Sequence, residues 1–362
     1  MPKRILLGAV GGVLIATSAL AQVPPLYQIV TIADWPPYCN GARMNNRGQI
    51  VFMGWYDTSD RRTEEILLYD RGQLLRLTDD YIQDVLPDIN DDGTIVWSRG
   101  LGPPDPEDGE PYLQVVMWRD GVLTQLTNSS YDEGVRAINN LGHVVWSRWK
   151  GEGLAGSSAD IYFYDGLTIH QITNDDWSNQ GPALNDDDWI AWTQYDFSQN
   201  PWDSRIALYA DGVVSLVSPP GSFEPQVPSI DNLGRVAWYS RAPVTHESLV
   251  EVWQNGAVST LTDRGGGPLL NDRGDITFWR WHSLPYGGYE VWLYRDGEFN
   301  QITVPVGDIS SVPTDANAGG EVAISSGRPW LGQLAVKCMR LRIGQAIPQG
   351  AGNVANIRPV PP

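Results

Sequence analysis

One short stretch recurs along the chain and constrains the fold more than any other feature. In its clearest copy, residues 138–146, an apolar residue leads into Asn-x-x-Gly and then into alternating apolar residues that end in Trp. The copies, aligned on their first residue, start at Asn45, Asn90, Asn139, Asn185, Asp231, Asn271 and Asn317. Successive copies lie 45, 49, 46, 46, 40 and 46 residues apart. A nearly constant period of about 40–50 residues is typical of β-propellers, so seven copies predict seven blades.

The chemistry of the stretch indicates a hairpin. Asn and Asp bond their own backbone at the first position of a turn, and Gly supplies the positive φ that closes it. The fourth copy has Asp188 in place of this Gly, and Asp tolerates the left-handed region better than most residues. A second hairpin cue follows, such as Asp120-Gly121 or Asn255-Gly256. Each unit therefore predicts four antiparallel strands, a to d, with tight a–b and c–d turns and a variable b–c loop.

The two ends of the chain bear on how such a ring closes. The last unit lacks a fourth strand, whereas residues 26–33 resemble a fourth strand without its hairpin. We expect this segment to complete blade seven beside Leu334–Met339, because closing the ring leaves only short, protected edges. The predicted fold class is all-β, a seven-bladed β-propeller of four-stranded antiparallel blades closed by N- and C-terminal strands.

The first 21 residues read as a secretory signal peptide. Lys3 and Arg4 precede an apolar run that ends at Ile15, and Ala19-Leu20-Ala21 is a small-residue cleavage site. The run is too short for a membrane anchor. We therefore expect cleavage after Ala21 and export to the periplasm or the cell exterior. The propeller is expected over residues 22–343, followed by a Gly/Pro-rich tail, 344–362, as a loose extension.

The charge and the cysteines limit the partners and the covalent links. A formal net charge of -18 argues against nucleic acid and against an anionic membrane surface as partners. We expect a monomer that does not insert into a membrane. The two cysteines, Cys39 and Cys338, can pair in an oxidising compartment and link the chain ends, although two free thiols fit the sequence equally well.

The repeat resembles that of a known family. Leu126-Thr127, then Asp132, then Ala137–Gly142 and a second strand ending at Asp165-Gly166 are similar to the TolB-type propeller repeat. Residues 83–93 match the Asp, Pro and Asp-Gly positions of that repeat. The resemblance identifies the chain as a distant TolB-like (WD40-like, PD40-type) propeller. It implies a fold more than a function, because such propellers include periplasmic binding proteins, peptidase domains and oligogalacturonate lyases.

The b–c loops vary most between the units, and variable loops on a rigid scaffold usually carry binding residues. Flat aromatic faces beside arginines suit sugar rings or the loops of a partner protein, although such aromatics can also pack loop against loop. The candidate ligand-binding residues are Trp55, Tyr56, Arg99, Arg148, Trp149, Tyr195, Trp202, Arg241, Arg280, Trp281 and Tyr286.

Catalytic and metal signals are weak. His246 and His282 fall in equivalent loops of adjacent units, and we treat them as weak catalytic candidates beside the simpler interpretation of ordinary loop histidines. The TolB-like lyases imply a metal site with several His ligands, and this set is not found. No His-Glu-x-x-His or Gly-x-Ser-x-Gly occurs. Asp88, Asn90 and Asp92 match the opening of a calcium loop, but the later Glu is missing, which favours a solvated turn. No other cofactor is expected.

Three functions remain from the sequence. We expect an exported binding module that recognises a polysaccharide or a cell-envelope protein through its b–c loop face. An extracellular polysaccharide-degrading enzyme, either a lyase or a glycoside hydrolase acting at the same face, is the alternative. A structural surface protein is the third possibility.

Overall fold

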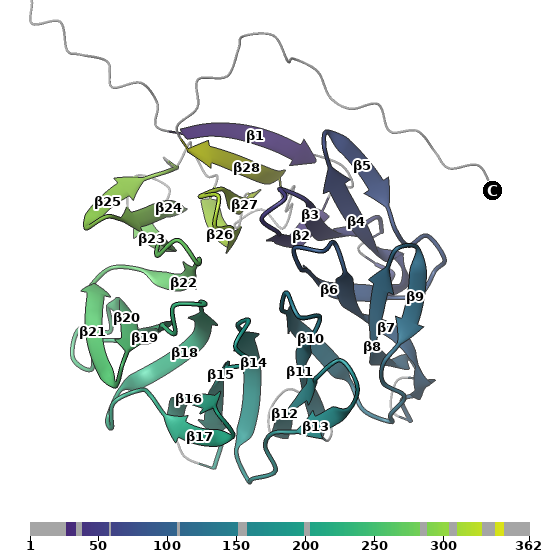
Figure 1. The fold of residues 1–362 in the computed structure, drawn as a ribbon, viewed down its shortest axis with the longest axis horizontal. Helices are drawn as coiled ribbons and strands as arrows, with labels where there is room; N and C mark the ends of the chain where they lie inside the picture. The colour runs from purple at the N-terminus through teal and green to yellow at the C-terminus, as the bar shows by residue number, and fades with distance from the viewer. Residues whose placement is uncertain are drawn as a thin grey trace, which may run out of the picture.

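The computed structural model describes residues 27–33, 38–57, 59–106, 109–150, 158–198, 203–282, 288–303, 310–327 and 337–343. These residues form seven four-stranded antiparallel sheets arranged around a central axis (Figure 1). The prediction of an all-β propeller with four-stranded antiparallel blades is confirmed. The predicted signal peptide and the C-terminal tail lie outside the described residues. Within the described part of the chain, no helix is long and apolar enough to span a bilayer.

Six of the sheets are each built from four strands that follow one another in the chain. Blade 1 contains β2 (Tyr38–Met44), β3 (Ile50–Trp55), β4 (Glu64–Asp70) and β5 (Gln73–Arg76), with the 3-10 helix η1 (Arg61–Thr63) before β4. Blade 2 contains β6 (Asp84–Ile89), β7 (Ile95–Pro104), β8 (Pro111–Arg119) and β9 (Val122–Gln125). Blade 3 contains β10 (Glu133–Ile138), β11 (Val144–Lys150), β12 (Ser158–Tyr164) and β13 (Ile169–Gln171).

The next three sheets follow the same plan. Blade 4 contains β14 (Ser178–Leu184), β15 (Ile190–Asp196), β16 (Asp203–Ala210) and β17 (Val213–Leu216). Blade 5 contains β18 (Phe223–Ile230), β19 (Val236–Arg241), β20 (Ser248–Gln254) and β21 (Ala257–Thr262). Blade 6 contains β22 (Gly266–Leu270), β23 (Ile276–His282), β24 (Gly288–Arg295) and β25 (Glu298–Gln301).

The remaining sheet, blade 7, combines both ends of the chain. It contains β26 (Ser310–Ala316), β27 (Val322–Gly327), β28 (Lys337–Ile343) and β1 (Tyr27–Ala33) in the order β1-β28-β27-β26. Strand β1 lies beside β28 (Figure 1) and pairs with it antiparallel, with Tyr27 opposite Ile343 in the register. The N-terminal segment is thus a strand, as expected, and its partner spans 337–343. Residues 334–336 of the predicted partner lie outside the described residues.

The core lies between neighbouring blades. The aromatic residue that ends the recurring stretch is fully buried in strand b of six blades: Phe52, Trp97, Trp146, Trp192, Trp238 and Phe278. Trp97, for example, packs with Val51 and Ile66 of the preceding blade. Burying a large aromatic side chain contributes about 2 to 3 kcal/mol. Four tryptophans of the recurring stretch thus serve blade-to-blade packing.

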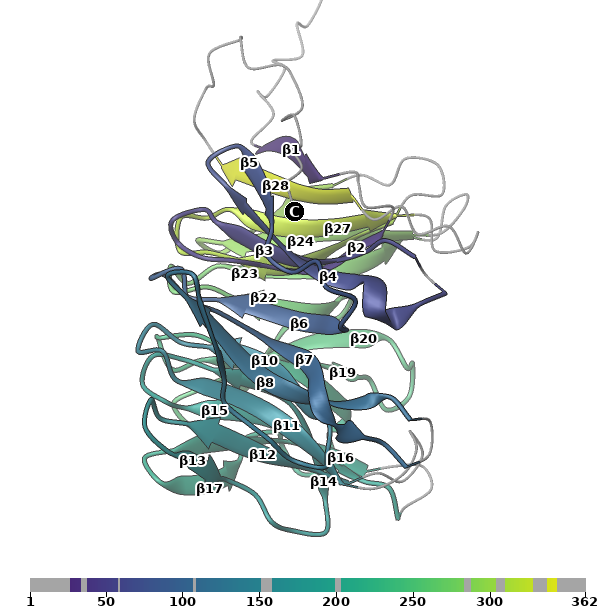
Figure 2. The same ribbon diagram turned by 90° about the vertical axis from the view of Figure 1, so that its right-hand side faces the viewer.

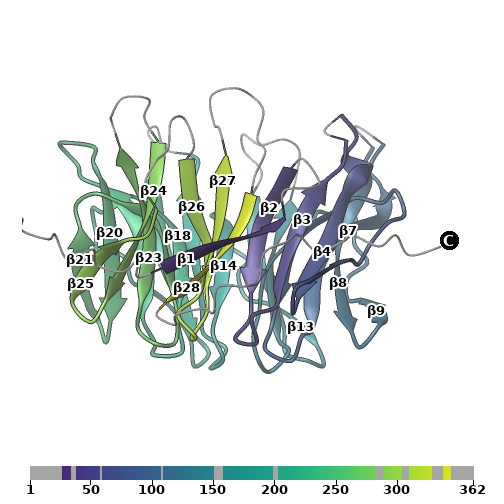
Figure 3. The same ribbon diagram turned by 90° about the horizontal axis from the view of Figure 1, so that it is seen from above.

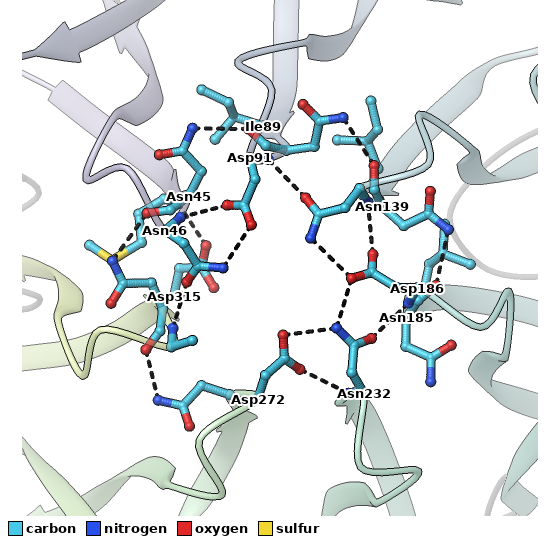
Figure 4. A pocket seen from close by; sticks show the side chains of 18 of the residues that line it. Asn45, Asn46, Ile89, Asp91, Asn139, Asn185, Asp186, Asn232, Asp272 and Asp315 are labelled. Atoms are coloured by element: carbon cyan, nitrogen blue, oxygen red, sulfur yellow. Dashed lines mark hydrogen bonds between the residues drawn. The ribbon is translucent and has the colours of Figure 1, made fainter.

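The Asn of each tight a–b turn has two tasks. Asn139 Oδ1 accepts from its own turn, at Leu141 N (3.1 Å) and His143 N (2.9 Å), while Nδ2 donates to Asn185 O of the next blade (3.0 Å). Equivalent links to the next blade start from Asn45, Asn90, Asn185, Asn271 and Asn317. Asn45, Asn139 and Asn185 are labelled in Figure 4. Asp231 cannot donate in this way. There Arg235 binds the Asp231 carboxylate and donates to Gly274 O at 3.2 Å.

The closing position of the a–b turn has a positive φ throughout. It is 82° at Gly142 and 83° at Gly93, and the expected Asp188 adopts it with a φ of 60°. Because an antiparallel meander reverses at each strand, the a–b and c–d turns share one face and the b–c loops share the other (Figures 2 and 3). We call the second one the loop face.

Candidate functional site

The first strand of each blade lines the axis, and its register shifts in every blade. The inner edge of such a strand has no neighbouring strand, so a proline there removes no ladder hydrogen bond. This explains the prolines at Pro87, Pro182, Pro228, Pro268 and Pro313. The shifts turn side chains toward the axis. They leave a cavity of about 580 Å³, the axial channel, on the side of the loop face.

Two arginines and two carboxylates line the axial channel. Arg43 lies 4.0 Å from Asp88 and also donates to Thr314 O. Each carboxylate accepts a backbone N–H of the next blade: Asp88 from Ile138 at 2.8 Å, and Asp315 from Met44 at 2.7 Å. Burial raises the pKa of Asp88 to about 7 and also raises the pKa of Asp315, because the channel walls exclude water. These carboxylates are thus mainly structural links between blades.

The second arginine, Arg136, lies at the register shift of β10. Its side chain is accessible to solvent within the channel, and no hydrogen bond or ion pair joins it to any residue that the structure describes. Burial and the like charge of Arg43 lower the pKa of its guanidinium. The channel therefore holds one cation whose donors are available to a ligand.

A second cavity, the groove, lies beside the channel, mainly in blade 4, with Ser158 of blade 3 at its edge. Tyr195 lines both the axial channel and this second cavity, of about 390 Å³. In that cavity the rings of Tyr195 and Phe197 are stacked, with centroids 5.5 Å apart and planes inclined by 4°. The groove is completed by Trp177, Asp176, Asp196, Ser158, Ser178 and Ser198. Arg205 stacks on Trp177 at 4.1 Å. Aromatic faces, carboxylates and hydroxyls thus surround one depression.

At the opposite mouth, the second residue of each a–b turn forms a ring that the sequence analysis missed (Figure 4). Around the axis these residues alternate between amide and acid, until an alanine ends the series: Asn46, Asp91, Asn140, Asp186, Asn232, Asp272 and Ala318. The alternation pairs donors with acceptors. Each Asp accepts hydrogen bonds from the backbone N–H and the side-chain NH2 of the Asn before it, as Asp186 does from Asn140 at 2.8 and 3.0 Å. The alternation was visible in the sequence, at the position after each aligned Asn.

Several predicted binding residues are engaged inside the propeller. Arg99 is only 4% exposed and pairs with Asp80 and, at 2.7 Å, with Asp84. Arg148 pairs with Glu133 at 2.7 Å. Arg280 stacks on Trp292 at 4.3 Å and donates to Arg264 O at 2.9 Å. Intramolecular partners thus hold the guanidinium groups of these three candidate ligand-binding residues.

The predicted aromatic residues divide between packing and accessible positions. Burial raises the pKa of Tyr56 to about 12, and Arg76 covers its ring at 4.1 Å. Trp55 donates to Asp60 O at 3.3 Å, and Trp149 is half-buried. Trp281 is 49% exposed, with Tyr289 against its edge at 5.0 Å. Trp202 and Tyr286 lie outside the described residues.

The remaining predicted arginine and the two histidines lie near the rim. Arg241 is exposed and lies 3.2 Å from Glu224. His246 is exposed, adopts a φ of 56° and lies against Phe223 with ring centroids 5.5 Å apart. His282 ends β23, with its backbone opposite Gly288, and its side chain is not among those described. A catalytic role for the two histidines stays a prediction.

The calcium-loop candidates direct their oxygens to separate partners. Asp88 points to Ile138 N and Arg43, Asn90 Oδ1 accepts from its own turn, and Asp92 lies 3.2 Å from Arg47. These partners are those of a structural turn. Calcium at this position stays an untested prediction.

The two cysteines lie in adjacent blades. Cys39 is buried in β2 among residues that include Ala323 and Ile32 of blade 7. Cys338 lies in β28 of that same blade, opposite Ala33 and Ser325. The side chain of Cys338 is not among those described, so the predicted disulfide remains a prediction.

Comparison with known proteins supports the fold. No family model and no curated protein matches this chain. The β-propeller domain of the Trilobed protease from Pyrococcus furiosus is 13% identical, with a TM-score of 0.57 over 80% of this chain and 91% of that one. An ulvan lyase, a polysaccharide lyase bound to a GlcA–Rha3S saccharide, is 11% identical, with a TM-score of 0.51 over 82% of this chain and 90% of that one.

TolB proteins are also among the similar structures. TolB from Acinetobacter baumannii is 17% identical, with a TM-score of 0.42 over 60% of this chain and 52% of that one. This chain thus spans about half the length of that TolB. The propeller domains with the higher TM-scores agree with the propeller fold that the repeat predicts. At these identities the comparisons establish the propeller fold and assign no activity.

Proposed function

We propose that this protein is an exported binding module that recognises a polysaccharide through the groove of blade 4 on the loop face. The stacked pair of Tyr195 and Phe197, next to Trp177 and bordered by carboxylates and hydroxyls, is the observation that carries the proposal. Aromatic rings cover the apolar face of a sugar, while carboxylates and serine hydroxyls accept from and donate to its hydroxyl groups.

The proposal includes a complete ring. The pairing of β1 with β28 supports closure of a seven-bladed propeller by its two chain ends. A closed ring holds the loop face rigid, and rigid surfaces lose less entropy when a ligand binds. Export follows from the predicted signal peptide and agrees with a ligand outside the cytoplasm.

Affinity electrophoresis through gels that contain neutral or acidic polysaccharides tests the proposal. We expect the mature protein to be retarded by at least one polymer. Phe197→Ala should weaken that binding roughly tenfold, equivalent to about 1.4 kcal/mol of lost stacking. Tyr81→Ala is the matched control, since Tyr81 is a 66% exposed aromatic that lies outside the groove, in the connection before β6.

The other outcomes separate the alternatives. Polymer that is shortened after the run would identify a lyase or a glycoside hydrolase on the same face and overturn the binding module. Absence of retardation by every polymer would also contradict the proposal, and a cell-envelope protein would then be the partner to seek by pull-down.

A further inference from the structure

Arg136 occupies a position where the other blades carry no charge. The equivalent residues, three before the aligned Asn or Asp of each turn, are Ala42, Pro87, Pro182, Pro228, Pro268 and Thr314. The alanine and the threonine are small, and the four prolines lie where no ladder hydrogen bond is lost. Such residues suit the wall of a narrow channel. A single long cation among them has no counterpart in the repeat. Blade packing therefore does not account for it.

The surroundings of Arg136 provide no internal counter-charge. Arg43 has Asp88 at 4.0 Å, whereas Arg136 has no ion pair or hydrogen bond among the described residues. The two nearby carboxylates already accept backbone amides, from Ile138 and Met44. Arg136 is exposed to solvent in the channel, so an anion that enters the channel can bind its donors in place of water. Guanidinium binds carboxylate and sulfate oxygens with two parallel hydrogen bonds.

One side chain, that of Tyr195, lines both the channel and the groove. A ligand that extends past Tyr195 therefore contacts both Arg136 and the Tyr195–Phe197 stack. Burial raises the pKa of Tyr195 to about 12, and its hydroxyl therefore stays a neutral donor beside the cation.

We propose that Arg136, with Arg43 and Tyr195 beside it, forms an anion subsite in the axial channel, beside the groove, that binds the carboxylate or sulfate group of an acidic sugar. This inference rests on the proposed function and adds its specificity: an acidic residue of the polysaccharide sits at the axis, and its neighbours lie over blade 4. The group that the subsite binds is an oxyanion, which is supplied either by the carboxylate of a uronate or by a sulfate ester.

Calorimetric titration of Arg136→Gln with three oligosaccharides tests the subsite: an oligouronate, a sulfated neutral oligosaccharide and its unsulfated parent. We expect the variant to bind the preferred acidic ligand 10- to 100-fold more weakly and the neutral ligand as tightly as the wild type. The preferred ligand identifies carboxylate or sulfate as the source. Arg61→Gln is the matched control, because Arg61 is an exposed arginine in the b–c loop of blade 1, on the same face. It should bind all three ligands like the wild type.

A second measurement does not need a polymer. Sodium sulfate should raise the melting temperature of the wild type more than that of Arg136→Gln at matched ionic strength, and the variant should fold, since it loses no internal ion pair. Equal effects on acidic and neutral ligands, or equal sulfate shifts in both proteins, would overturn the subsite. If Phe197→Ala weakens binding to a neutral polymer while Arg136→Gln does not change binding to any ligand, the result would support the binding module and reject the subsite.

Discussion

Blades 2 and 4 bury the same three-position arrangement beneath the loop face, but only blade 2 builds it from ions. In blade 2, Asp84 accepts from Trp97 Nε1 at 2.5 Å and from Arg99 at 2.7 Å. In blade 4, Asn179 Oδ1 accepts from Trp192 Nε1 at 2.7 Å and from Gln194 at 3.0 Å. The sequence separations are the same in both blades, 13 and 15 residues.

The comparison shows that both blades keep the same hydrogen-bond geometry at these three positions. The acceptor and the second donor can be an ionic pair, as in blade 2, or two neutral amides, as in blade 4. Burial opposes the ionic version, since it raises the pKa of Asp84 to about 7 even though Arg99 lowers it. A buried ion pair often stabilises no more than neutral groups of similar shape, but loss of one partner leaves a buried charge. The two blades therefore have different weaknesses.

The largest effect is expected when the pair in blade 2 is broken. Arg99→Leu removes every guanidinium donor and leaves the Asp84 carboxylate with Trp97 and Thr78 as side-chain hydrogen-bonding partners. At pH 8 we expect a loss of about 3 kcal/mol in the free energy of unfolding. Urea denaturation measures it, with Arg205→Leu as a half-exposed control arginine. A loss below about 1 kcal/mol would show that Arg99 is dispensable to the blade.

A smaller effect is expected from pH. The pKa values of Asp84 and Asp88 are raised to about 7, compared with about 4 in an unfolded chain. The native state therefore binds more protons than the unfolded state between these values. The free energy of unfolding should decrease as pH rises from about 4 to 7 and level off above, by on the order of 2 kcal/mol for each group.

Urea denaturation at several pH values measures this slope. Asp84→Asn combined with Arg99→Gln should reduce it, because one of the two titrating groups is gone. A steeper slope in that variant, or a wild type that becomes more stable from pH 4 to 7, would contradict the assignment.

The smallest effect is expected when blade 2 is converted to the chemistry of blade 4. The same double variant, Asp84→Asn with Arg99→Gln, reproduces the Asn179 and Gln194 set at matching positions. We expect its free energy of unfolding at pH 8 to stay within about 1 kcal/mol of the wild type. Loss as large as that of Arg99→Leu would mean that the two blades are not equivalent.

The fold could be predicted from the sequence because its determinants are local. The turn at Asn139, the left-handed Asp188 and the aromatic at Trp146 depend on neighbouring residues in the chain, and each was confirmed. The candidate site depends on contacts between strands distant in the sequence. Whether Arg99 faces a ligand or Asp84 is decided across a strand pair.

The position of Arg136 could not be predicted for a related reason. Its direction follows from a register shift in β10. The repeat carries this shift in every blade, but the sequence does not show that the residue at the shift faces the axis. Tyr195 was a candidate from its loop position alone, but its place between two cavities became apparent only in the folded blade. Phe197 and Trp177 were not among the predicted binding residues.

The ring that the second residues of the a–b turns form has an odd number of members, seven. Donor and acceptor can alternate without a fault only around an even number of members, and the seventh member of this ring, Ala318, has neither an amide nor a carboxylate side chain. The fault falls in blade 7, where the two chain ends also meet. The side-chain hydrogen bonds of the ring are therefore interrupted between Asp272 and Ala318, whereas Ala318 N still donates to Asn46 Oδ1. Under mechanical load, we expect the propeller to open first at blade 7, where β1 pairs with β28, while the other six blades stay linked.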